Sequence, residues 1–256
     1  MNNIIKSKSN KYFSLIKKLS IKKYRKQEGL FIIEGIKLID EAIKNKKNIE
    51  LIAFNSSFLE KNPSFITEKI SKYKYFVFED DLFFNLTEMK SPEGMLGLVS
   101  IDDEKEVNND RVLLLDGLKD PGNLGTIIRS CDAFDFRDIV LINDCCDPYN
   151  SKVIRSSMGS IFRVNIKEAD INFIKELKDK GYSLYSSSLD KKGQKPVLDK
   201  KIILTIGSES HGVSDEVYDI TDFFLKIKMC GSIDSLNAGV AASILMHDIY
   251  ENNLIV

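Results

Sequence analysis

Near the middle of the chain, an apolar run leads directly into an amphipathic segment, and this pairing restricts the possible folds. Residues 112–115 are all Val or Leu, as is typical of a strand that is buried on both faces. Farther along, apolar side chains recur at the helical spacing i, i+3, i+4 and i+7, at Leu124, Ile127, Ile128 and Cys131. A buried strand followed by a helix is the repeating unit of α/β folds. We therefore predict a strand over 111–116 and a helix over 123–134.

The alternation of strand and helix patterns continues through the second half of the chain. There we predict strands over 138–142, 162–166, 182–187, 201–206 and 223–227, and helices over 151–159, 170–180 and 235–251, with a short helix after Ser214. Such a series is typical of an α/β fold with a mainly parallel sheet flanked by helices.

A smaller set of alternating patterns fills the first hundred residues. We predict helices over 9–19, 35–45, 63–71 and 81–86, and strands over 30–33, 50–55, 75–79 and 96–100. Residues 102–110 are polar, charged and without a period, which is typical of a linker. The sequence therefore predicts a smaller α/β domain over 1–101, a linker over 102–110 and a larger domain over 111–256.

The charges are unevenly distributed, although the net charge is only −1. Residues 1–48 hold 13 Lys and Arg against 4 Asp and Glu, whereas the remainder holds 24 against 34. A basic segment on an acidic body indicates a surface that binds a polyanion such as nucleic acid. A lysine-rich helix that faces only solvent is the alternative interpretation.

The cysteines, histidines and apolar runs argue against several classes of protein. Cys131, Cys145, Cys146 and Cys230 form neither a C-x-x-C pair nor a disulfide framework, which predicts reduced thiols and a cytoplasmic protein. With only two histidines in the chain, we expect no metal site. No apolar run reaches the roughly 18 residues of a membrane span, so we expect no membrane segment.

Polar residues follow the ends of three predicted strands. Asn123 and Arg129 lie on one helix, with Arg129 outside its apolar stripe, and the loop Gly207–Gly212 follows another strand. Ser235 or Asn237 lies at the amino end of the terminal helix. Because ligand sites of open α/β sheets gather at the carboxyl ends of strands, these residues are a candidate site. A helix cap and a solvated arginine are the alternative for Asn123 and Arg129.

The common nucleotide and hydrolase motifs are absent. No G-x-G-x-x-G follows a strand and no G-x-x-x-x-G-K-[ST] occurs, which argues against a dinucleotide fold or a P-loop. The Ser-Glu-Ser-His-Gly run at 208–212 has Ser where the hydrolase motif G-x-S-x-G needs its first Gly.

Three segments in the same order resemble the signature motifs of the SpoU (TrmH-like) RNA ribose 2′-O-methyltransferases. They are D-P-G-N-L-G-T-I-I-R at 120–129, G-S-E-S-H-G at 207–212, and I-K-M-C-G-S-I-D-S-L-N-A at 227–238. The intervening segment 147–159 also matches, and residues 24–35 resemble an L30e-like substrate-binding domain. The resemblance covers nearly the whole chain.

This resemblance implies S-adenosylmethionine as the methyl donor, a homodimer, and a trefoil knot formed by the loops at 186–188, 207–212 and 229–237. It implies that Arg129 is the central catalytic residue, oriented by Asn123 and assisted by Glu209, Ser235 and Asn237. The expected cofactor-binding residues are Ser187, Gly207, Glu209, Ile227, Met229, Ser235, Leu236 and Asn237.

The expected substrate is RNA, most readily ribosomal RNA. We expect its phosphates to contact the basic residues Lys17, Lys18, Lys22, Lys23, Arg25 and Lys26. Transfer RNA is an alternative substrate. A non-catalytic RNA-binding or ribosome assembly factor, and a methyltransferase of the same fold that acts on a base or a protein side chain, are alternative functions.

Overall fold

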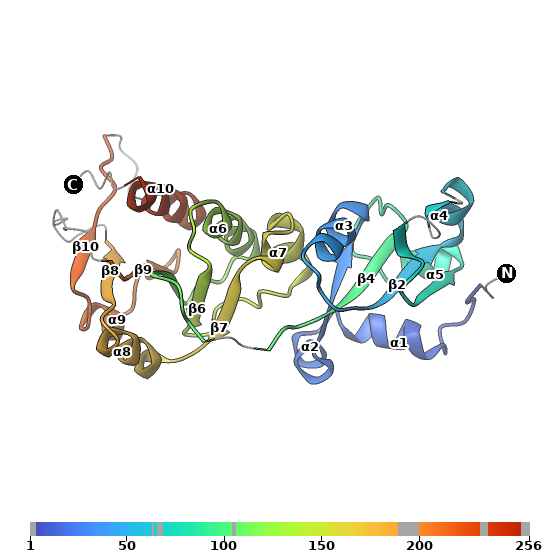
Figure 1. Cartoon of the computed structure of the whole chain (residues 1–256), viewed down its shortest axis with the longest axis horizontal. Coiled ribbons are helices and arrows are strands. Elements are labelled where there is room, and N and C mark those ends of the chain that lie inside the picture. Colours follow the sequence, from blue (N-terminus) through green and yellow to red (C-terminus); the bar gives the residue numbers. More distant parts are fainter. Residues whose placement is uncertain are drawn as a thin grey trace. The chain divides into compact units, whose positions relative to one another are not determined.

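A computed structural model of the whole chain describes residues 4–62, 64–65, 69–103, 106–188, 200–230 and 235–251 (Figure 1). Its contacts divide the chain into two compact units. The N-terminal unit comprises Met1–Asp102 together with Tyr149–Phe162. The C-terminal unit comprises Asp103–Pro148 and Arg163–Val256. No helix of the described residues is long and apolar enough to cross a membrane.

The N-terminal unit is built on a four-stranded sheet. Its strands are β1 (Leu30–Glu34), β2 (Ile49–Asn55), β3 (Tyr75–Phe78) and β4 (Met95–Ser100), in the order β1-β4-β2-β3. Strand β4 is antiparallel to both of its neighbours, and β2 and β3 are parallel. The helices of this unit are α1 (Lys11–Lys18), α2 (Lys22–Glu28), α3 (Ile36–Lys44), α4 (Ser56–Lys61), α5 (Asp80–Phe84) and α7 (Ser151–Ser156).

One face of this sheet carries the core that holds α1 and α5 in place. Phe13, Ile16 and Leu19 from the α1 region pack with Leu82 and Phe83 of α5 and with the apolar residues of β2 and β4. All five side chains are buried. At roughly 1.5–3 kcal/mol for each fully buried large apolar side chain, this cluster is a main source of stability for the unit.

The C-terminal unit is built on a six-stranded sheet, in which every pairing is parallel. Its strands are β5 (Arg111–Asp116), β6 (Asp138–Ile142), β7 (Asn165–Glu168), β8 (Ser183–Ser187), β9 (Ile202–Gly207) and β10 (Phe223–Leu225), in the order β10-β8-β9-β5-β6-β7. The predicted α/β fold, with a mainly parallel sheet after a smaller domain, is confirmed.

Helices cover both faces of the six-stranded sheet (Figure 1). Val112, Leu114 and Val140 pack against α8 (Ile171–Asp179) and α9 (Asp215–Tyr218). Because side chains alternate along a strand, the residues between them face α6 (Pro121–Ala133) and α10 (Ala238–Tyr250) on the other side. Helices α6 and α10 pack against each other, and an added Cβ on Gly239 would lie 3.5 Å from Thr126 Cβ. The absence of a side chain on Gly239 allows this close approach of the two helices.

Helix α2 was not predicted from the sequence. Arg25 is only 5% exposed, and its Nη1 donates to the Leu19 carbonyl at 2.7 Å. Gly29 then ends the helix with a φ of +64°, a left-handed conformation that glycine adopts readily. The buried arginine holds this short segment against the unit.

Other differences lie at the ends of elements or outside the described residues. The strand predicted at 162–166 is a 3₁₀ turn at Ser160–Phe162 followed by β7, and α4 was not predicted. The predicted helix 63–71, the linker 102–110 and the knot segment 229–237 each lie partly outside the described residues. The knot and the domain boundaries therefore stay predictions.

The segment Tyr149–Phe162 joins the N-terminal unit although it lies between two strands of the C-terminal sheet. The Tyr149 ring lies 4.9 Å from the ring of Phe31 in β1, measured between centroids, and the Phe162 ring lies 6.5 Å from it. No feature of the sequence pattern indicated this grouping.

Candidate active site

Helix α6 begins with a cap that fixes the first of the predicted polar residues. The Asp120 side chain accepts a hydrogen bond from the Asn123 backbone N–H at 2.8 Å. Pro121 is the first helical residue, where its lack of an N–H is harmless because first-turn N–H groups have no partner inside a helix. Asn123 is thereby held in the first turn, shortly after the carboxyl end of β5.

Asn123 connects the three predicted segments through its side-chain amide. Its Nδ2 donates to Glu209 Oε1 at 2.6 Å, and its Oδ1 accepts from Asn237 Nδ2 at 2.9 Å. Asn237 Oδ1 in turn accepts from the backbone N–H groups of Gly239 and Val240, and so caps α10. These three side chains form a continuous chain, hereafter the Glu209–Asn123–Asn237 chain. The structure thus brings three predicted site residues into direct contact.

Arg129 lies farther along α6 and is exposed, as predicted. Within the described part of the chain its side chain makes no hydrogen bond or ion pair, and in particular none with Asn123. The two side chains make no direct contact in the structure, and the expectation that Asn123 orients Arg129 stays a prediction. Residues six apart on an α-helix point about 120° away from each other, so their side chains diverge.

The loop after β9 closes tightly on itself. Ser208 and Gly212 exchange two backbone hydrogen bonds, of 2.9 and 3.0 Å. A Cβ on Gly207 would lie 2.0 Å from the Gly212 carbonyl carbon, which no relaxation of a side chain could relieve. The family resemblance implies that Gly207 binds the cofactor. The closest approach in the structure is instead made by the chain's own backbone.

A second anchor for this loop was missed by the sequence reasoning. Asp116, at the end of β5, is buried and accepts from the Ser214 backbone N–H at 2.7 Å and from Asn143 Nδ2 at 2.8 Å. Asn143 Nδ2 also donates to Glu216 Oε1 at 2.9 Å. The one available signal was a carboxylate at the end of an otherwise apolar strand, because a buried carboxylate needs hydrogen-bond partners.

Several predicted cofactor-binding residues lie at one edge of the sheet. Ser187 ends β8, Gly207 ends β9, and Ile227 and Met229 follow β10. These three strands are neighbours and parallel, so their carboxyl ends lie side by side. Ser187, Ile227 and Met229 are half-buried. Ser235 and Leu236 directly precede the Asn237 cap, and the residues before them, 231–234, lie outside the described part.

Comparison with known proteins identifies the family. Residues 110–247 match the SpoU rRNA Methylase family. The chain belongs to this family. Residues 10–97 match the MRM3-like substrate binding domain. The SpoU membership and the substrate-binding domain ahead of it, both predicted from the sequence, are thus confirmed.

Individual proteins resemble this SpoU chain along almost its full length. It is 32% identical over 248 residues to the 23S rRNA (guanosine(2553)-2′-O)-methyltransferase RlmP of Bacillus subtilis, covering 96% of this chain and 98% of RlmP. A putative RNA methyltransferase of the TrmH family from Porphyromonas gingivalis has 27% identity and a TM-score of 0.82, with 94% and 97% of the two chains covered. The SpoU methyltransferase AviRb from Streptomyces viridochromogenes, solved with its cofactor AdoMet, shares the fold, with a TM-score of 0.84, 23% identity, and 95% and 98% covered.

The predicted RNA-binding residues differ in exposure within the substrate-binding unit of this SpoU protein. Lys17, Lys18, Lys23 and Lys26 are exposed, and Lys22 is half-buried. The Lys17 ammonium donates to the Asn85 carbonyl at 2.7 Å. Arg25 is buried against Leu19, so its place on a phosphate-binding surface is corrected to a structural role.

Two cysteines close to the candidate site are poor nucleophiles. Burial raises the pKa of the Cys145 thiol to about 11 and that of Cys146 to about 12. Nearby negative groups, Cys145 itself and then Asp120, Asp147 and Glu209, raise the pKa of Cys146 further. Because the thiolate is the reactive form, neither thiol suits covalent catalysis at neutral pH.

Proposed function

We propose that the protein transfers a methyl group from S-adenosylmethionine to the ribose 2′-oxygen of a nucleotide in ribosomal RNA. The observation that carries this proposal is the Glu209–Asn123–Asn237 chain, which links the three SpoU motifs at the carboxyl edge of the parallel sheet. A ligand at this edge would meet all three segments in a fixed arrangement.

The sheet edge suits S-adenosylmethionine. When bound, this cofactor supplies a methyl group already activated on a sulfonium, so the protein needs no covalent catalysis of its own. Ile227 and Met229 offer half-buried apolar surface for an adenine ring, beside the polar ends of β8 and β9 at Ser187 and Gly207. We assign these four residues, with Ser235, Leu236, Asn237 and Glu209, to cofactor binding.

Arg129 serves as an electrostatic residue in this proposal. A guanidinium remains protonated in proteins, which makes it a poor base but a permanent cation. Its exposure leaves it accessible to an RNA phosphate and to the 2′-oxygen as negative charge develops there. The proton of the 2′-hydroxyl then passes to phosphate or water. Alignment of the hydroxyl with the methyl group supplies the rest of the acceleration.

The similarity to RlmP over almost the whole of both chains supports a guanosine of 23S ribosomal RNA as the first substrate to test. The basic N-terminal segment and the match to a substrate-binding domain support an RNA substrate more generally. The four free thiols support a reducing compartment such as the cytoplasm.

We further propose a homodimer. Val240 and Tyr250, both on α10, are 47% and 45% exposed, which is apolar surface that a second copy of the chain would cover. Sedimentation velocity would give a mass close to twice 29.1 kDa if this is right, and a monomer over the micromolar range would contradict it.

Mass spectrometry of nucleosides tests the proposed function. Unmodified ribosomal and transfer RNA would be incubated with S-adenosylmethionine and either the wild type, Arg129→Ala or Arg137→Ala. Arg137 is a matched control because its exposed side chain pairs with Asp135 on the surface. We expect a 2′-O-methylnucleoside in ribosomal RNA with the wild type and Arg137→Ala, and at least a hundredfold slower formation with Arg129→Ala.

Other outcomes would support the alternative functions. A methyl group on a base or on a protein would contradict ribose methylation. Methylation of transfer RNA alone would show that transfer RNA, and not ribosomal RNA, is the substrate. A folded protein that does not bind S-adenosylmethionine in calorimetry would favour a non-catalytic RNA-binding factor.

A further inference from the structure

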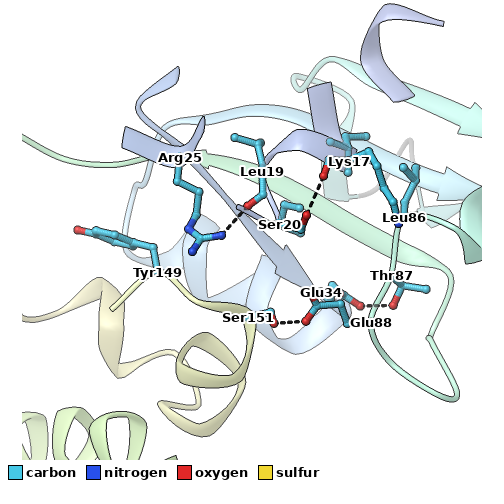
Figure 2. Close-up of a pocket in the computed structure, with 12 residues that line it drawn as sticks. Lys17, Leu19, Ser20, Arg25, Glu34, Leu86, Thr87, Glu88, Tyr149 and Ser151 are labelled. Carbon is cyan, nitrogen blue, oxygen red and sulfur yellow. Dashed lines mark hydrogen bonds between the residues drawn. The ribbon is translucent and has the colours of Figure 1, made fainter. Parts of the chain in front are cut away.

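The N-terminal unit contains a cavity that the proposed methyl transfer does not use. Its volume is about 140 Å³, and all its lining residues come from three segments of that unit, at 16–34, 86–88 and 149–151. Ile16, Leu19 and Leu86 are buried apolar residues that line it, and together form its apolar floor. Leu19 and Leu86 are labelled in Figure 2. An engineered apolar cavity of roughly 150 Å³ binds benzene, so this volume suits one aromatic ring.

Charged groups of both signs surround this apolar floor. Glu34 and Glu88 supply carboxylates, and Lys17 and the buried Arg25 supply cations (Figure 2). A cavity that presents both acceptors and donors around an apolar floor suits a neutral, flat molecule with polar edges. It does not suit a phosphate, which the two carboxylates would repel.

The two carboxylates are held in place by neighbouring hydroxyl groups. Glu34 Oε2 accepts from Thr87 Oγ1, and Glu88 Oε2 accepts from Ser151 Oγ. An ionised carboxylate can accept about four hydrogen bonds. Each carboxylate therefore keeps capacity for a donor on a bound molecule, while its orientation is already fixed.

These features favour one kind of base. Cytosine presents an amino group, which carboxylates bind well, and uracil presents a carbonyl oxygen at the same position. The carbonyl and ring nitrogen of cytosine are acceptors that suit Lys17 or Arg25. A purine has a second ring, which exceeds the room for a single ring. Bases recognised in this way are unpaired, because pairing would occupy the same edge.

We propose that this cavity binds one unpaired cytosine of the RNA substrate, with Glu34 and Glu88 accepting from its amino group. The proposal rests on the proposed function, because it takes RNA as the substrate. It assigns the substrate-binding unit a base-specific contact in addition to phosphate contacts, since Lys18, Lys23 and Lys26 lie exposed on the adjoining helices α1 and α2.

Short RNA probes test the proposal on the full-length protein. Fluorescence anisotropy would compare heptamers of uridine that carry cytidine, uridine or adenosine at the centre. We expect the cytidine probe to bind about tenfold more tightly than the other two. A probe with 5-iodocytidine at its centre should cross-link on illumination to peptides that contain residues 16–34, 86–88 or 149–151.

Two variants with the same charge change separate the cavity from the general surface. Glu34→Gln keeps an oxygen for Thr87 but adds an amide donor, so the preference for cytidine should fall to nearly none. Glu60→Gln changes an exposed residue outside the cavity and should keep the preference. Equal affinity of the wild type for all three probes, or an unchanged preference in Glu34→Gln, overturns the proposal. The proposal is also overturned if arginine amide binds at the cavity and none of the RNA probes competes with it.

The outcome separates this proposal from the proposed function. Methyl transfer to ribosomal RNA without any cytidine preference would refute the cavity assignment and leave the activity standing. A cytidine preference that Glu34→Gln removes, without methyl transfer to any RNA, would support the cavity and refute the proposed activity.

Discussion

At the scale of single residues, Gly207 shows how a site residue can be required by the chain itself. We expect Gly207→Ala to displace the loop 208–212, because its Cβ would lie 2.0 Å from the Gly212 carbonyl carbon. The free energy of unfolding should fall by about 1–3 kcal/mol, and the affinity for S-adenosylmethionine should drop at least tenfold. Urea denaturation and calorimetry would measure the two effects.

Gly181→Ala is the control for this substitution. Gly181 has a φ of +86°, and an added Cβ there would meet nothing within 4 Å. The substitution should cost about 1 kcal/mol of backbone strain and leave cofactor affinity unchanged. Equal loss of cofactor affinity in both variants would show that the tight loop does not shape the cofactor site.

At the scale of elements, Asn237 has two functions that can be separated, since it caps α10 and donates to Asn123. Asn237→Ala should lose both functions, and its free energy of unfolding should fall by about 1 kcal/mol. Asn237→Asp keeps the capping oxygen but loses the amide donor. It should therefore retain most of its thermal stability and still lose methyl transfer.

Asn10→Ala is the matched control, because Asn10 caps α1 in the N-terminal unit and accepts from the Tyr12 N–H at 2.9 Å. Its free energy of unfolding should fall by a similar amount, and its rate of methyl transfer at saturating RNA should be unchanged. If Asn237→Asp were fully active, the Glu209–Asn123–Asn237 chain would be structural only.

Secondary structure was predicted well where a strong period or a cap fixes it. Strand β5 occupies the predicted residues 111–116, and β9 lies within one residue of its prediction, because each contains a buried, mainly apolar run. The contacts of Asp116 with Ser214 and of Asn123 with Glu209 were not predicted. They join residues 98 and 86 positions apart and depend on β5 and β9 being neighbours, which no local pattern specifies.

At the scale of the whole molecule, the basic residues of α1 and α2 should govern affinity for RNA. We expect reversal of Lys18, Lys23 and Lys26 to glutamate to weaken RNA binding. It should also reduce the slope of log affinity against log salt concentration by roughly 2–3, because each phosphate contact contributes about 0.7–0.9. Anisotropy titrations between 50 and 200 mM salt, a range over which such slopes are resolved, would measure this.

Reversal of Lys61, Lys175 and Lys180 is the matched control, since these lysines are exposed and lie outside the basic N-terminal segment. Both triple variants change the net charge equally, so a nonspecific charge effect would reduce the slope in both.

Arg25→Ala should instead lower stability, because its loss leaves the buried Leu19 carbonyl without its donor.

The grouping of Tyr149–Phe162 with the first hundred residues bears on how proteins of this kind can exchange parts. The chain passes between the two units three times, at 102–103, 148–149 and 162–163. If only residues 1–102 were grafted from a relative, Tyr149 would pack against the relative's β1 and would lose its own partner, Phe31. The transferable module is therefore discontinuous, and recombination at a single crossover would separate partners that have to be inherited together.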